Sequence, residues 1–278
     1  MTYGKRSTLL AIGLAFLILC AASFPVSVVI LHRTGWEGHP ISRLTSHHWW
    51  LSYDTVSPDG RQYVWYASAL LLLALFVFVA CIILRSIYRR TAAADVFFFL
   101  IFLVTIGFEL LRPWIALLSM RGGSVLLAAV SARFVYFGRF FGWTALLISS
   151  LYAIDIQYRN LGMLLLASLL LSLTLASSMP LDSAAMLADY LFRLGDEPAI
   201  LFIVLVCQLA AVANYFAAAY RRQNRRFTGA ALAVLLTVLG RLTVSFLGSP
   251  GQTIAGFVLC VAGILLFIRQ MNQIYLWV

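Results

Sequence analysis

Eight long runs of apolar residues, separated by short polar segments, limit most strongly what this chain can fold into. Each run is close to the ~20 residues that an α-helix needs to cross a bilayer core of roughly 30 Å. Lipid cannot hydrogen-bond to a peptide backbone, so a spanning segment must be a helix or a strand of a closed barrel. Runs that are apolar throughout, rather than alternating with polar residues, select helices. The sequence predicts spanning helices at about 8–31, 63–84, 96–119, 125–153, 161–177, 198–219, 228–247 and 253–270.

The composition supports the same fold class, an all-α polytopic transmembrane helical bundle. Of the 278 residues, 63% are hydrophobic and 11% are charged, against roughly 25% charged in a soluble domain. This leaves too little polar surface to cover a water-soluble globule, so no soluble catalytic domain is expected. The cysteines lie inside apolar runs without CxxC or Cys/His spacing, which indicates small buried residues rather than disulfides or a metal site. They are Cys20, Cys81, Cys207 and Cys260.

Clusters of arginine between the spans predict the orientation of the chain. The only lysine, Lys5, lies in the N-terminal tail, so no span can carry a retinal Schiff base. Most basic residues lie on one side if the N-terminus is inside, and the positive-inside rule then places both termini in the cytoplasm of a bacterial-type plasma membrane. Short clusters such as RSIYRR (85–90) and YRRQNRR (220–226) anchor helices beside anionic membrane lipids. They also suit a cytoplasmic protein partner, whereas no nucleic-acid partner is expected.

The first apolar run divides the chain into two parts. Residues 1–62 hold an anchor span and a polar outer loop, and residues 63–278 hold a seven-helix unit. The first span is interpreted as an uncleaved anchor because its apolar character extends beyond a usual signal-peptide core, and cleavage near Ala21–Ser23 is the alternative. A short outer interfacial helix is predicted near 182–195, with Asp182 as its N-cap.

All four histidines lie in the first outer loop, at 32–62. His47, His48 and Asp54 are weak candidates for a metal site, because imidazole and carboxylate are zinc ligands. Adjacent histidines cannot easily reach one ion from a regular element, and the spacing matches no metal motif. The favoured interpretation is an interfacial loop whose tryptophans lie at headgroup depth. No metal or other cofactor is expected.

The segment GFELLRPW, residues 107–114, carries charge inside the third apolar run. Ionisable groups within spans are rare, and they usually face a bundle interior or a water-filled cavity. At ~1.5 Å per residue, Glu109 in span three and Arg133 in span four lie at a similar depth, which makes them the expected ion pair. Pro113 lacks an N–H, so the Glu109 carbonyl four residues earlier loses its helical donor. That carbonyl is expected to accept from Arg133, Arg241 or water.

An excess of arginine at this depth predicts an anion-binding site. Arg112, Arg133 and Arg241 against Glu109 leave a charge of three minus one, or +2, and uncompensated charge in a low-dielectric interior needs water or an anion. The arginine fork suits carboxylate or phosphate. The sequence therefore predicts an outward-facing cavity that binds an anionic small molecule or a lipid headgroup, and the alternative is a structural ion pair without a ligand. The predicted ligand-binding residues are Glu109, Arg112, Arg133, Tyr136, Arg139, Gln208 and Arg241.

Two local signals concern helix packing and helix capping. Gly138 and Gly142 are four residues apart in the fourth run, a spacing that lets another helix approach closely. Asp95 precedes the third run and is expected to cap that span.

Three functions stay open on the sequence. The first is a sensor or membrane subunit that binds its ligand from outside and acts through partners. The second is a transporter of a small anionic or lipid-like substrate, which buried charge favours and the lack of an internal repeat disfavours. The third is an intramembrane enzyme acting on lipid-linked substrates. It ranks last, because the chain has no HExxH, GxSxG or phosphate-binding glycine motif.

Overall fold

Helices make up nearly all of the computed structural model, which describes residues 3–33, 47–48, 51–52, 60–120, 124–156, 160–186, 191–195, 197–245 and 250–275. Within these ranges, eight helical segments are long and apolar enough to cross a membrane, which confirms the predicted number of spans and fits a multi-pass membrane protein. Seven of them are α1 Tyr3–Arg33, α2 Gly60–Thr91, α5 Val125–Ala153, α6 Leu161–Ser178, α7 Glu197–Arg221, α8 Arg226–Ser245 and α9 Pro250–Tyr275. The third span consists of α3 Ala94–Val104, the 3-10 helix η3 Thr105–Leu111 and α4 Arg112–Met120. The strands are β1 His47–His48, β2 Leu51–Ser52, β3 Leu181–Met186 and β4 Phe192–Leu194.

Pro113 accounts for the break in the third span. In a regular α-helix the Glu109 carbonyl would accept from residue 113, which has no N–H. It accepts instead from the backbone N–H of Arg112, and this i→i+3 bond is the 3-10 pattern. The donors predicted for this carbonyl, Arg133 and Arg241, are therefore wrong, because the backbone tightens and supplies its own donor.

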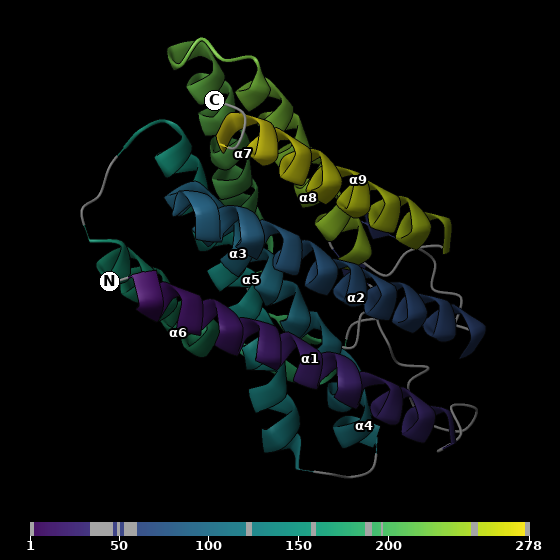
Figure 1. Ribbon diagram of the computed structural model, residues 1–278. Coiled ribbons are helices and arrows are strands. Elements are labelled where there is room, and N and C mark those ends of the chain that lie inside the picture. Colours follow the sequence, from purple (N-terminus) through teal and green to yellow (C-terminus); the bar gives the residue numbers. More distant parts are fainter. Residues whose placement is uncertain are drawn as a thin grey trace.

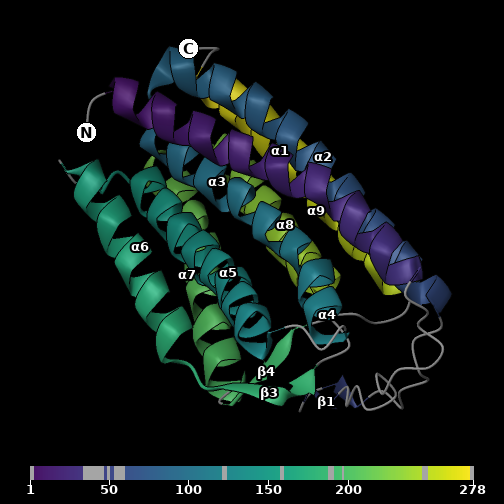
Figure 2. The same cartoon turned by 90° about the horizontal axis from the view of Figure 1, so that it is seen from below.

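The central helix of the bundle is α5. It packs against α3, η3, α4, α6 and α7, while α1 and α2 contact α3 and η3 from another side (Figure 1). The bundle is completed by the α8–α9 pair, in which α8 contacts α7 and α9 contacts α2 (Figure 2). The third span is the most buried of the eight. Charged groups on it are therefore held in the interior.

Glycines let α8 and α9 approach closely along their length. A Cβ atom at Gly240 would lie 2.4 Å from the backbone nitrogen of Cys260, and one at Gly263 would lie 2.4 Å from Oγ1 of Thr237. Small residues at such contacts are a common basis of helix association in lipid. This packing holds α8, which carries Arg241, in a fixed position against α9.

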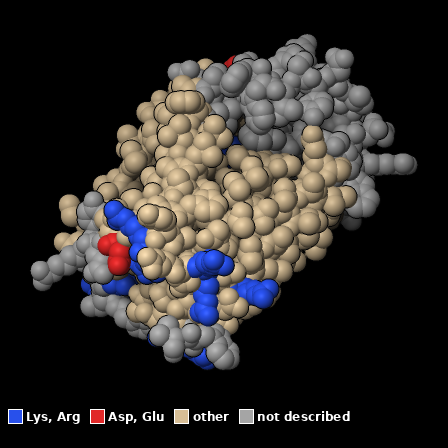
Figure 3. Space-filling view, turned by 90° about the horizontal axis from the view of Figure 1, so that it is seen from above, with Lys and Arg blue, Asp and Glu red and all other residues tan. Residues whose placement is uncertain are grey.

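The molecule has chemically different ends. The start of α1 and the end of α9 lie near the same end of the bundle (Figure 2). Lys and Arg side chains gather at this end, and a broad surface with few charges follows it (Figure 3). We call it the arginine end; its placement in the cytoplasm stays a prediction. Its exposed arginines are Arg89, Arg90, Arg221, Arg222, Arg225, Arg226 and Arg269.

A β-hairpin takes the place of the interfacial helix predicted near 182–195. Strands β3 and β4 pair antiparallel, with Asp182 opposite Arg193. Phe192 and Leu194 flank Arg193 and are both buried, in a second apolar core with residues of α5 and α7. The helix prediction is wrong because Phe192 and Leu194 are two residues apart, the spacing that places both on one face of a strand. The hairpin lies at the end opposite the arginine end (Figure 2), which we call the hairpin end.

Candidate functional site

Charged side chains from four helical segments meet in the interior of the bundle. They are Glu109 on η3, Arg112 on α4, Arg139 on α5 and Arg241 on α8. Glu109, Arg112 and Arg241 are only 2%, 0% and 5% exposed, and the side chain of Arg139 is 11% exposed. Together with Thr105 these residues form what we call the Glu109 cluster. A buried ion is costly unless it is paired and hydrogen-bonded, so the partners of each group decide what the cluster can do.

Two guanidinium groups hold the Glu109 carboxylate. Nη2 of Arg112 donates to Oε2. Nε of Arg139 donates to Oε1 at 3.0 Å, and its Nη2 donates to Oε2 at 3.4 Å. Both carboxylate oxygens are therefore engaged by cations, in the forked geometry that arginine favours. Such an arrangement fixes charge rather than transfers protons, so it gives no support to Glu109 as a catalytic acid or base.

Arg241 reaches the cluster from α8. Its Nη1 donates to Oγ1 of Thr105 at 3.1 Å, and its guanidinium lies 5.0 Å from the ring centroid of Phe102. A Cβ atom at Gly142 would lie 2.3 Å from that Thr105 oxygen and 2.8 Å from Nη1. A Cβ at Gly138 would lie 2.5 Å from the Phe108 ring, so the predicted close approach at both glycines is confirmed. Without a side chain at residue 142, Thr105 and Arg241 can meet against α5.

One nitrogen of this arginine has no acceptor in the part of the chain that the structure describes. Nη2 of Arg241 is buried and makes no hydrogen bond with any residue that the structure describes. A buried donor without a partner loses its hydrogen bonds to water and gains none. Arg112, Arg139 and Arg241 carry three positive charges and Glu109 one negative charge, so the formal charges of these four described residues sum to three minus one, or +2. This sum equals the one expected from the sequence, with Arg139 in the place of Arg133.

That difference corrects the predicted ion pair between Glu109 and Arg133. Arg133 is exposed on the outer face of α5, and Arg139 takes the place expected for it. Both arginines stand on one helix, but six residues at 3.6 per turn place them on different faces. The depth of an arginine in the membrane therefore predicted its pairing with Glu109 less well than its position around the axis of α5. Arg133 instead resembles a lipid-facing residue whose long stem lets its head reach the interface.

Two further predicted residues, Tyr136 and Gln208, lie apart from the salt bridges. The hydroxyl of Tyr136 donates to the backbone carbonyl of Phe192 in β4 at 2.8 Å, and its ring centroid lies 5.4 Å from the Arg139 guanidinium. Tyr136 thus links the hairpin to the edge of the Glu109 cluster. Gln208 is buried on α7 with an Oε1 atom that has no donor among the described residues. No hydrogen bond between described residues joins it to the cluster.

A second polar network lies where α3 begins, toward the arginine end. Asp95 accepts from the Tyr275 hydroxyl through Oδ2 at 2.8 Å and from the backbone N–H of Val96 through Oδ1 at 2.9 Å. Oγ of Ser149 donates to the backbone carbonyl of Asp95 at 2.7 Å and lies 2.8 Å from the Tyr215 hydroxyl. The network joins α3, α5, α7 and α9. The N-cap position of α3 is Ala93 rather than Asp95, but the Asp95 carboxylate does accept one backbone N–H of the first turn, and it also ties α3 to the last turn of α9.

The candidate metal ligands gain no support from the described residues. His47 and His48 form the short strand β1, whereas Asp54 lies outside the described residues. Among the residues that the structure describes, no group of three or more His, Cys, Asp and Glu side chains is placed to hold a metal ion.

Comparisons with known proteins assign no family to the chain. No protein-family model, no curated protein and no solved structure matches it. The function must therefore be argued from the geometry of the Glu109 cluster.

Proposed function

We propose that this multi-pass membrane protein binds an anionic group, a carboxylate or a phosphate, at the Glu109 cluster inside its helical bundle. The observation that carries the proposal is the buried guanidinium of Arg241, whose Nη2 has no acceptor in the described structure. A bound anion would supply the missing acceptor for Nη2 of Arg241 and would also offset the positive charge of this guanidinium. A structural ion pair would need only Glu109 and one arginine.

The ligand is proposed to enter from the hairpin end, beside Arg139. Arg139 is the least buried arginine of the cluster, and its neighbour Tyr136 is bonded to the hairpin. An anion that attracts the Arg139 guanidinium would weaken its contact with the Tyr136 ring. Occupancy of the site would in this way be transmitted to the hairpin.

This link supports a role as a sensor or membrane subunit that acts through a partner protein. In the proposed orientation the hairpin end faces outside and the arginine end faces the cytoplasm, where exposed arginines are available to a partner. The ligand is then an external anionic small molecule or a lipid headgroup in the outer leaflet.

The second candidate function is transport of a small anion. It is favoured by the interrupted third span, because η3 places Thr105 and Glu109 at a break between α3 and α4. Transporters often bind substrates at discontinuous helices near the middle of the membrane. Uptake of radiolabelled phosphate or acetate by proteoliposomes that contain the chain would favour transport over sensing.

Binding is tested by thermal unfolding of the detergent-solubilised chain with sodium acetate or sodium phosphate at constant ionic strength. A bulky sulfonate serves as the reference anion. At 100 times the dissociation constant, a ligand that binds only the folded state adds about 2.7 kcal/mol to the free energy of unfolding. We expect at least one probe to raise the melting temperature of the unmodified chain.

The Arg241→Met variant should lose this rise, whereas the matched Arg133→Met variant should keep it. Arg133 is the control because it is also an arginine on a membrane-spanning helix, but it lies on the exposed face of α5. No rise with either probe, or an equal rise in the Arg241→Met variant, would contradict the proposal.

A further inference from the structure

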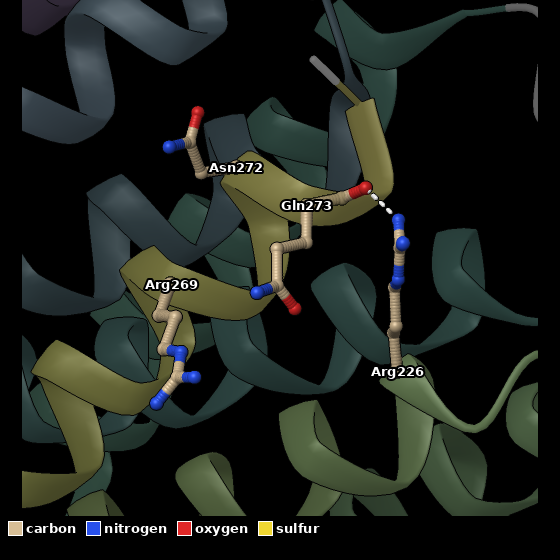
Figure 4. A pocket seen from close by; sticks show the side chains of 4 residues that line it. All are labelled: Arg226, Arg269, Asn272 and Gln273. Carbon is tan, nitrogen blue, oxygen red and sulfur yellow. Dashed lines mark hydrogen bonds between the residues drawn. The ribbon is translucent and has the colours of Figure 1, made fainter. Parts of the chain in front are cut away.

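A basic pocket opens between α8 and α9 at the arginine end, away from the Glu109 cluster. It has a volume of about 380 Å³ and is lined by Arg226, Arg269, Asn272 and Gln273 (Figure 4). Arg226 is the first residue of α8, and the other three belong to the last turns of α9. None of these four described lining residues is acidic. We call it the α8–α9 pocket.

Its two arginines are held differently. Nη1 of Arg226 donates to the backbone carbonyl of Gln273, which fixes the guanidinium beside the end of α9 (Figure 4). Arg269 is exposed and extends on the other side of the Gln273 side chain (Figure 4). The pocket thus has a guanidinium on each side and an amide between them, all of which can donate hydrogen bonds to one anion.

The surface that leads to the pocket is apolar. Ile254, Val258 and Leu265 on α9 are each about half exposed. Helical spacing places them on the same face as Arg269, which follows Leu265 by four residues and Val258 by eleven. This face lies on a membrane-spanning helix. It therefore presents an apolar stripe at membrane depth that ends in a cationic group at the level of the lipid headgroups.

We propose that the α8–α9 pocket binds the phosphate of an anionic phospholipid, whose acyl chains lie along the exposed stripe of α9. Basic pockets between spanning helices are suited to anionic headgroups, and the arginine fork matches phosphate oxygens. The apolar stripe selects a lipid over a free anion, because it offers contact area only to acyl chains. This site is independent of the anion site proposed at the Glu109 cluster.

The test is native mass spectrometry of the full chain in detergent, titrated with phosphatidylglycerol and, separately, with phosphatidylcholine. We expect tighter binding of phosphatidylglycerol. Each arginine near the headgroup should contribute about fivefold in affinity, which corresponds to ~1 kcal/mol. The Arg226→Gln/Arg269→Gln variant should therefore lose roughly 25-fold.

The matched control is Arg221→Gln/Arg225→Gln, which removes the same charge from the neighbouring α7–α8 surface. It should lose less than about twofold if the pocket is specific, because diffuse attraction to a basic surface is a small part of binding. Arg269→Gln alone gives a second measure, since its side chain makes no hydrogen bond or salt bridge within the described structure, and it should lose about fivefold.

An equal loss of phosphatidylglycerol affinity in both double variants would show that the α8–α9 pocket is not the binding site. Equal binding of phosphatidylglycerol and phosphatidylcholine would contradict the preference for anionic headgroups. Displacement of phosphatidylglycerol by an equal concentration of inorganic phosphate would show that the ligand is a free anion and overturn the lipid assignment. Arg241→Met should leave lipid binding unchanged. A negative result for the α8–α9 pocket would therefore not count against the anion site proposed at the Glu109 cluster, and the reverse also holds.

Discussion

Removing the charge of Glu109 is expected to destabilise the bundle more than any single change to the arginines around it. Glu109→Gln keeps the size and shape of the side chain but raises the charge of the cluster from +2 to +3. It also removes the carboxylate charge that forms the salt bridges with Arg112 and Arg139. Breaking a buried ion pair from one side typically costs about 3–5 kcal/mol. For a chain of this size that is roughly 6–20 °C in melting temperature, at ~2–4 °C per kcal/mol.

The chain carries its own reporters for this measurement. Cys20, Cys81 and Cys260 are buried, so a maleimide dye that fluoresces on reaction reports their exposure as the detergent-solubilised protein unfolds. Arg133→Met is the control, and it should melt within about 2 °C of the unmodified chain, because exposed sites rarely change stability by much. Adding Arg241→Met to Glu109→Gln should recover part of the loss, as the charge falls back from +3 to +2. If the Glu109→Gln variant melts at the same temperature as the Arg133→Met control, the carboxylate is not the anion that holds the cluster together.

Three further predictions concern other parts of the structure. Gly142→Ala should separate Arg241 from its partner Thr105 and cost about 1–3 kcal/mol, the usual cost of overpacking, measured by the same dye assay. Tyr275→Phe should cost about 1–3 kcal/mol by leaving the buried Asp95 carboxylate without its side-chain donor, and amide hydrogen exchange should rise at the ends of α3 and α9. Single cysteines introduced at 220–226 should be protected from a membrane-impermeant maleimide in intact cells, whereas cysteines in the β3–β4 hairpin should react; the reverse pattern would invert the proposed orientation.

The spans were predictable because their signal is local. Twenty consecutive apolar residues have few alternatives, and each such run folds as a helix near its predicted bounds. The hairpin was not predictable in the same way, because a helix and a strand both bury some of its apolar residues. Phe192 and Leu194, two residues apart and both buried, have the spacing that favours a strand.

The membership of Arg139 in the site was also readable from the sequence, although depth alone does not show it. A stripe of residues at alternating spacings of four and three runs along the fourth span, and every member except Arg139 is small or apolar. It consists of Ala128, Ala132, Val135, Arg139, Gly142, Leu146, Ser149 and Ala153. All of these but Arg139 are fully buried in the structure. A single arginine on such a stripe must face the interior, whereas Arg133 falls outside it.

Contacts between distant parts of the chain had no such signal. Tyr275 meets Asp95 across 180 residues, and Arg241 meets Thr105 across 136. These pairs depend on how α8 and α9 are placed against α3 and η3. That placement is set by shape, through glycines and 3-10 geometry, rather than by a residue pattern in any one segment.

The way the Glu109 cluster is built argues against a purely structural role. Glu109 and Arg112 are three residues apart on one span, so their pairing alone joins no two helices, and only Arg139 extends the salt bridge to α5. Arg241 lies near that ion pair, but its hydrogen-bonded partner among the described residues is the neutral Thr105. It nevertheless requires a glycine at residue 142, and it brings a positive charge beside two others. A buried cation whose hydrogen-bonded partner is neutral, and whose Nη2 has no acceptor among the described residues, is better explained by a group that is bound from outside the chain.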